Sequence, residues 1–294
     1  MQSFAESKRA GTPETLRESN SLGWGKSLGL RSGKDDMNFQ KKIFVKYVYA
    51  ILKTAAELLY PPRCPVCDEL LSPGKNAICI SCEKKITRIT ELVCKKCGKP
   101  LSNERKEYCG DCARKHHSYR QGKAVFLYKG EMRQSLYRFK YSNRREYASF
   151  YAGEAVSQYA SWVRRREIEV IVPIPMYTGK KRRRGYNQAE VFAKALGRKM
   201  DIPVETKLVK RTRDTIPQKE LNDNERKKNL KNAFQVTTQK TQKNQKVQKN
   251  QYKQVLLVDD IYTTGSTMDA VAEVLLSSGA QNIYYICISI GQGN

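Results

Sequence analysis

Apolar and polar positions follow an alternating strand and helix pattern through the second half of the chain. Short apolar runs predict strands at 123–129, 170–172, 255–258 and 283–290. Apolar residues spaced every three to four positions predict helices at 132–139, 147–165 and 188–200, and another helix from Met268 onwards. Such alternation is typical of an α/β domain with a mostly parallel sheet, in which ligands bind at the carboxyl ends of the strands. We expect this domain to occupy residues 120–294.

Three segments depart from this pattern. Residues 1–36 are rich in serine, glycine and charge, which predicts a disordered extension. Residues 37–62 carry apolar side chains at helical spacing, which predicts an amphipathic helix. Its lysines are compatible with a membrane surface, but we favour docking onto the body of the protein. Residues 235–254 are nearly all Gln, Lys, Asn and Thr, which predicts a flexible basic insert within the α/β domain.

Composition adds a strong charge signal. The 294 residues include 55 Lys and Arg against 29 Asp and Glu, a formal net charge of +26, and 39% of them are hydrophobic. The hydrophobic content excludes a wholly disordered chain, and the charge predicts a polyanionic partner. Nucleic acid is the first choice, a phosphorylated ligand the second and a membrane surface the third. Because no apolar run reaches membrane-spanning length, we expect a cytoplasmic protein, with association at the inner face of the membrane left open.

Eight of the nine cysteines form four C-x-x-C pairs, each beginning fifteen residues after the last. Two such pairs supply the four thiolates of one tetrahedral zinc site, so four pairs predict two structural zinc ions. We place this double zinc ribbon at 63–115 and favour pairing in sequential order, although interleaved pairing fits the same spacing. Redox chemistry is the weaker alternative, because nothing around the pairs resembles thioredoxin. The predicted ligands are Cys64, Cys67, Cys79, Cys82, Cys94, Cys97, Cys109 and Cys112.

The segment 255–267 carries the clearest candidate chemistry. Asp259 and Asp260 follow four aliphatic residues, and a hydroxyl-rich turn with one glycine then leads into the helix that contains Met268. Free amide groups at a helix N-terminus favour a phosphate, and a glycine lets the backbone approach it. The acid pair can accept from ribose hydroxyls or hold magnesium through water. This pattern predicts a phosphosugar site with Asp259 and Asp260 as candidate catalytic residues and a phosphate loop of Thr263, Thr264, Gly265, Ser266 and Thr267.

Two further polar clusters accompany this motif. The cations at 180–184 follow the strand at 170–172 and predict a clamp for pyrophosphate or nucleic-acid phosphates, with a solvated basic loop as the alternative. The candidate residues of this cluster are Lys181, Arg183, Arg184, Asn187 and Gln188. Of these, we expect Asn187 to cap the following helix. The second cluster suggests a loop, a short helix and a return strand. A ligand site and a solvated polar face fit it equally well, and its residues are Arg211, Gln218, Arg226 and Asn229.

The motif at 255–267 resembles the phosphoribosyl-pyrophosphate (PRPP) motif of type I phosphoribosyltransferases, in which the acids hold the ribose and the loop holds the 5'-phosphate. In order, the cysteine pairs and the segments 184–189, 210–234 and 255–267 resemble the ComF family. This resemblance implies a double zinc ribbon followed by a type I phosphoribosyltransferase-like domain that takes PRPP with magnesium. It also implies a role in natural transformation, with single-stranded DNA and the competence helicase ComFA as partners.

Two features separate the chain from purine-type phosphoribosyltransferases. Thr263 stands where those enzymes often carry an acid that acts on the base. The two histidines, His116 and His117, directly follow the cysteine pairs, so we expect no histidine near the phosphosugar site. We therefore favour a DNA-uptake factor that binds single-stranded DNA and uses the PRPP-like pocket as a regulatory or structural element. The alternative is an active, magnesium-dependent phosphoribosyltransferase whose acceptor the sequence does not identify.

Overall fold

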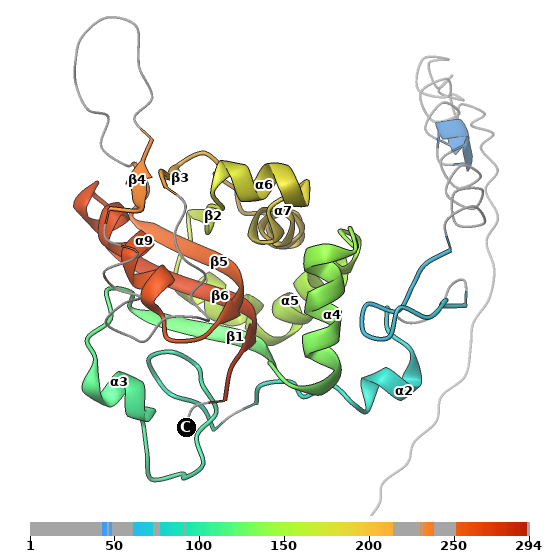
Figure 1. Ribbon diagram of the computed structural model, residues 1–294, viewed down its shortest axis with the longest axis horizontal. Coiled ribbons are helices and arrows are strands. Elements are labelled where there is room, and N and C mark those ends of the chain that lie inside the picture. The colour runs from blue at the N-terminus through green and yellow to red at the C-terminus, as the bar shows by residue number, and fades with distance from the viewer. Residues whose placement is uncertain are drawn as a thin grey trace, which may run out of the picture. The chain divides into compact units, whose positions relative to one another are not determined.

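A computed structural model describes residues 43–45, 47–48, 61–72, 77–90, 92–213, 230, 232–237 and 251–292 (Figure 1). The chain divides into two units, Met1–Leu58 and Leu59–Asn294. In the first unit, residues 43–45 and 47–48 are helical, and most of the amphipathic helix predicted at 37–62 lies outside the described residues. The predicted disordered extension at 1–36 and the centre of the predicted insert, 238–250, lie outside the described residues.

A parallel sheet of four strands forms the centre of the second unit. Its strands are β1 (Gln121–Leu127), β2 (Val170–Pro173), β5 (Gln254–Tyr262) and β6 (Asn282–Ile290), in the order β1-β6-β5-β2. All three pairings are parallel, with Pro173 opposite Val258 between β2 and β5. In β6, eight of the nine residues are buried, as expected for a strand covered on both faces. The predicted α/β class is confirmed.

Helices cover both faces of this sheet (Figure 1). They are α4 (Gly130–Tyr141), α5 (Tyr147–Arg165), α7 (Gln188–Met200) and α9 (Ser266–Ser277). Alternate residues of β5 belong to different apolar clusters. Leu256 and Val258 pack in the cluster that contains residues of α4, α5 and α7, whereas Val255 and Leu257 pack in the cluster that contains α9. This division follows from the two-residue period of a strand.

The short elements α6, β3 and β4 bear on the predictions for the basic run and for the flexible insert. The basic run at 180–184, for which we considered a loop, lies in a short helix, α6 (Thr178–Arg184), which ends at Gly185 with a left-handed φ of 85°. Strands β3 (Val209–Arg211) and β4 (Phe234–Val236) pair antiparallel, and β4 is the predicted return strand. Because β4 extends to Val236 and β5 begins at Gln254, strand pairing includes both ends of the segment predicted as a flexible insert.

Candidate functional site

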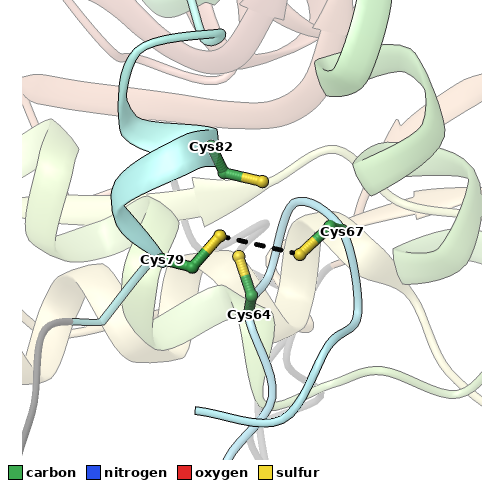
Figure 2. A group of neighbouring side chains, drawn as sticks. All are labelled: Cys64, Cys67, Cys79 and Cys82. Carbon is green, nitrogen blue, oxygen red and sulfur yellow. Dashed lines mark hydrogen bonds between the residues drawn. The ribbon is translucent and has the colours of Figure 1, made fainter. Parts of the chain in front are cut away.

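The eight paired cysteines form two compact clusters. Figure 2 shows the four side chains of the first cluster pointing toward one another, with Cys79 and Cys82 at the helix α2 (Ile80–Glu83). Within each cluster all ligand sulfurs lie within 4.8 Å of one another. Sequential pairing is therefore the arrangement that the structure adopts. The clusters are Cys64, Cys67, Cys79 and Cys82, and Cys94, Cys97, Cys109 and Cys112.

The sulfur geometry fits zinc. A tetrahedral ion with Zn–S bonds near 2.3 Å places its sulfur ligands about 3.8 Å apart. The Sγ atoms of Cys67 and Cys79 are 3.7 Å apart, and those of Cys97 and Cys109 are 3.6 Å apart. Together with the four-thiolate donor sets, these distances suggest two structural zinc ions.

The two clusters are built on a repeated turn. In the first, the Asp68 amide donates to the Cys64 carbonyl at 2.9 Å, and in the second the Gly98 amide donates to the Cys94 carbonyl at 2.9 Å. Asp68 and Gly98 both adopt a left-handed backbone, with φ of 72° and 74°. A short helix then starts after the third cysteine of each cluster, α2 in the first and α3 (Gly110–Arg114) in the second. The same local geometry therefore recurs after thirty residues.

The first cluster is tied to α5 and to the α4–α5 connection through Asp68, and to α4 through Val66. The Arg144 guanidinium lies 2.8 Å from one carboxylate oxygen of Asp68, and the Tyr147 hydroxyl donates to the other. Arg138 also donates to the Val66 carbonyl at 2.7 Å. Burial alone would raise the pKa of Asp68, but the Tyr147 and Arg144 contacts outweigh it and hold the pKa below its usual value. Asp68 therefore joins the cysteine turn to the α/β domain as a carboxylate.

The acid pair lies at the carboxyl edge of the sheet, where β5 delivers it. The Asp260 amide donates to Asp259 Oδ1 at 2.8 Å, and Lys140 Nζ lies 3.0 Å from Asp260 Oδ2. The side chains of Lys140 and Asp260 are only 19% and 15% exposed, so this ion pair is shielded from solvent. Sequence reasoning missed Lys140. The sequence offers one indication of Lys140, which is that it directly follows Phe139 at the end of the helix predicted at 132–139.

The pKa values of Asp259 and Lys140 depend on burial and on the neighbouring charges of this site. Burial raises the pKa of Asp259 to about 8, and the neighbouring charge of Asp260 acts in the same direction, against Lys140 and Arg211. Burial disfavours the charge of Lys140, but Asp260 outweighs that effect and raises the pKa of Lys140. Lys140 thus stays a cation paired with Asp260, whereas Asp259 keeps its proton through part of the neutral pH range.

The predicted phosphate loop connects β5 to the first turn of α9. Gly265 has φ of 83°, and a Cβ at this position would lie 2.6 Å from the Tyr262 hydroxyl and 3.1 Å from His117 Cε1. Only glycine fits both the left-handed backbone and the close neighbours at this position. Thr264 Oγ1 and Ser266 Oγ lie 3.1 Å apart. The first amides of α9 have no acceptor within the helix, and its dipole favours an anion at this end.

A histidine lies beneath this loop, which corrects the expectation that none would be nearby. His117 is 3% exposed, and its Nδ1 lies 2.8 Å from Asp269 Oδ2 in the first turn of α9. The Ser118 amide donates to the other oxygen of Asp269 at 2.9 Å. The expectation failed because the chain that leaves the second cysteine cluster passes directly under the loop. These contacts give His117 a positioning role.

Tyrosine side chains continue this connection toward the second cysteine cluster. The Tyr119 and Tyr262 hydroxyls lie 2.7 Å apart, and the rings of Tyr262 and Tyr285 stack at 4.9 Å. The Tyr285 hydroxyl donates to the Cys97 carbonyl at 2.7 Å. A buried series of contacts therefore runs from a cysteine ligand to the end of the strand that carries the acid pair.

In the basic cluster at 180–188, some side chains contact residues next to the acid pair and others do not. Lys181 Nζ lies 2.7 Å from Glu190 Oε2, and Arg184 donates to Gln188 Oε1 at 2.7 Å. Gln188 in turn donates to the Lys140 carbonyl at 3.5 Å, which links this cluster to the acid site. Arg183 is exposed on α6.

Asn187 has the predicted capping role. Its side chain accepts from the Ala189 amide at 3.2 Å at the start of α7 and donates to the Ile174 carbonyl at 2.9 Å. In the second predicted cluster, Arg211 lies on β3 with its guanidinium 5.3 Å from the Phe234 ring. Its charge also reaches Asp259, where it lowers the pKa. The remaining members, Gln218, Arg226 and Asn229, lie outside the described residues.

The fold and the cysteine clusters define a class of protein. Residues 55–113 match the double zinc ribbon domain, and residues 186–291 match the phosphoribosyl transferase domain. The molecule is thus a phosphoribosyltransferase-like α/β protein with a Cys-rich double zinc ribbon. In the part of the chain that the structure describes, no helix combines the length and apolar character needed to cross a bilayer.

Sequence relatives identify the family. Competence protein F of Haemophilus influenzae is 31% identical over 224 residues, which cover 75% of this chain and 93% of that protein. DNA utilization protein YhgH of Escherichia coli K12 is 29% identical over 234 residues, covering 79% and 98%. Competence protein ComFC of Bacillus subtilis is 28% identical over 216 residues, covering 71% and 82%. The chain belongs to the ComF family.

Proposed function

We propose that this protein is a DNA-uptake factor of natural transformation, which binds single-stranded DNA in the cytoplasm and holds a phosphoribosyl ligand at the carboxyl edge of its sheet. The observation that carries the proposal is the match, over most of the chain, to relatives named for competence and for DNA utilization. The net charge of +26 supports a polyanionic partner. The helicase ComFA, which the family resemblance implies, belongs to the same proposal.

The proposed pocket ligand is magnesium-bound PRPP. Asp259 and Asp260 would accept from the ribose hydroxyls or hold the ion through water, and the loop Thr263–Thr267 would receive the 5'-phosphate. Support comes from the sharp turn at Gly265, which places hydroxyl groups at the start of α9. Ligand entry would release Asp260 from Lys140 and leave a cation beside the incoming phosphates.

The basic residues of α6 and the start of α7 would complete the site. Arg184 donates to Gln188, and Gln188 donates to the carbonyl of Lys140, the residue that pairs with Asp260. The side chain of Arg183 is exposed to solvent. Lys181 would contribute to pyrophosphate binding only after leaving Glu190. Arg211, whose charge reaches Asp259, and the cluster members Gln218, Arg226 and Asn229 are proposed to line the same pocket.

The second candidate function is active phosphoribosyl transfer, which the match to the phosphoribosyl transferase domain favours. Cationic side chains would stabilise pyrophosphate as it leaves an oxocarbenium-like ribose, and electrostatic stabilisation would supply most of the rate. His117 is committed to Asp269, so we assign it no proton-transfer step.

Binding of both ligands to the purified full chain tests these proposals. A labelled oligothymidylate and labelled PRPP with magnesium are titrated separately and then each in the presence of the other. We expect both to bind, and we expect PRPP binding to be lost in Asp259→Asn/Asp260→Asn while DNA binding persists. Release of pyrophosphate with a nucleobase or DNA present, abolished in the same variant, would establish the enzymatic alternative. Absence of DNA binding would refute the uptake proposal.

A further inference from the structure

Helix α4 exposes aromatic residues on its outer face. Its inner face buries Met132, Leu136 and Phe139, whereas the side chains of Tyr137 and Tyr141 are 63% and 60% exposed. These two tyrosines are four positions apart, and their rings lie 4.9 Å from each other with an interplanar angle of 46°. A single exposed tyrosine is common on a protein surface, but two adjacent exposed rings leave a larger area of π-surface in water.

One arginine contacts these rings, and two more lie on the neighbouring surface. The Arg184 guanidinium lies 4.8 Å from the centre of the Tyr141 ring and donates to the Tyr141 hydroxyl at 3.2 Å. Exposed Arg133 lies one turn before Tyr137 on α4, with its guanidinium 5.9 Å from the centre of the Tyr128 ring. Arg145 is also exposed; its guanidinium lies 4.6 Å from the centre of the Tyr186 ring and close to Gly185, the residue that follows Arg184. Aromatic rings bordered by cations thus form one surface, which we call the tyrosine face: Arg133, Tyr137, Tyr141, Arg145 and Arg184.

We propose that the tyrosine face binds single-stranded DNA by stacking bases on Tyr137 and Tyr141 while its three arginines contact the phosphates. Bases of a single strand have free π-faces that stack on aromatic rings whatever the sequence, and guanidinium groups pair with phosphate oxygens. Duplex DNA keeps its bases stacked on each other and offers the rings no partner. This inference rests on the proposed function, since it assigns a place to the DNA that the function requires.

The tyrosine face also borders the phosphosugar site. Lys140 lies on the same helix and pairs with Asp260, and Arg184 contacts Gln188, which donates to the Lys140 carbonyl. A strand on the tyrosine face therefore runs along the rim of the acid site.

The test compares full-length variants in fluorescence anisotropy with a labelled oligothymidylate. Tyr137→Ala/Tyr141→Ala should bind at least about 30-fold more weakly, because two stacking contacts are lost together. Tyr137→Phe/Tyr141→Phe retains both rings and should bind like the wild type. Tyr108→Ala removes a 46% exposed tyrosine of the second cysteine cluster and is the matched control, with unchanged affinity. Arg145→Gln should reduce the salt dependence of binding, whereas the alanine pair should leave it unchanged.

Crosslinking of the wild-type protein to an oligonucleotide that carries 5-iodouracil provides a measurement independent of variant folding. We expect crosslinks on Tyr137 or Tyr141, and crosslinks confined to other segments would overturn the inference. Equal affinity of the wild type and the alanine pair would overturn it too, while leaving the proposed function standing. If the wild type binds no single-stranded DNA, the proposed function itself fails. If the alanine pair loses self-association or vesicle binding but keeps its DNA affinity, the face serves a second copy or a membrane, and the inference is wrong.

Discussion

At the scale of single residues, the acid site depends on how Lys140 and the two aspartates share charge. Lys140 lies 3.0 Å from Asp260, and both side chains are largely shielded from water. A charge in such a place is stabilised by its partner and becomes unfavourable when the partner is removed. The ion pair therefore neutralises the charge of Asp260 in the absence of ligand and must open when a sugar or metal ion approaches Asp260.

Lys140→Met should lower the free energy of unfolding by about 1–3 kcal/mol, because it leaves the Asp260 carboxylate without its cation. Asp260→Asn in the same background should recover part of this loss, since the unpaired charge is then removed. Urea unfolding of the wild type, both single variants and the double variant gives the coupling energy. Strictly additive effects would show that the two side chains do not interact in solution.

Asp259 predicts a pH dependence of ligand binding. Its pKa in the folded protein, about 8, lies above the ordinary value, so the folded state favours the proton. The resulting stabilisation is fully present at low pH and is lost as pH rises through about 8. A ligand that needs the carboxylate must displace this proton, so affinity for magnesium-bound PRPP should rise between pH about 6 and about 9. Titration calorimetry in buffers of different ionisation enthalpy measures the proton released. A pH-independent affinity with no proton release would contradict this prediction.

At the scale of elements, the cysteine clusters are attached to the α/β domain by specific contacts. Asp68 connects the first cluster to Arg144 and Tyr147, and Tyr285 connects β6 to the Cys97 carbonyl of the second. His117 follows the second cluster and holds the first turn of α9 through Asp269. The cysteine turns thus contact the helices and strand ends that form the candidate site.

Asp68→Asn tests this attachment with little change in the backbone, because Asn tolerates the left-handed conformation that Asp68 adopts at φ of 72°. Loss of the charged contact with Arg144 should lower the free energy of unfolding by about 1–3 kcal/mol at neutral pH. Denaturant unfolding of the zinc-loaded protein measures the change. Glu107→Gln, which removes an exposed pair with Lys95 in the second cluster, is the control and should have little effect. Equal stability of Asp68→Asn and the wild type would contradict a structural role for this contact.

At the scale of the whole molecule, the sequence predicted what depends on local pattern. Buried strands such as Val170–Pro173, the helices and the grouping of cysteines follow from apolar periodicity and ligand spacing. Lys140 and His117 were missed because their partners are distant in sequence: Lys140 pairs with Asp260, and His117 with Asp269. Such contacts exist only after the sheet assembles. The helical form of the basic run was also missed, because five successive cations obscure the periodicity.

Binding of single-stranded DNA to the full chain at increasing salt concentration tests the central claim most directly. The account predicts that the logarithm of the affinity falls steeply and linearly with the logarithm of the salt concentration, because lysine and arginine side chains release counterions from the phosphates. Fluorescence anisotropy with a labelled oligothymidylate measures this slope. No binding, or an affinity that does not respond to salt, would contradict a role in handling incoming DNA.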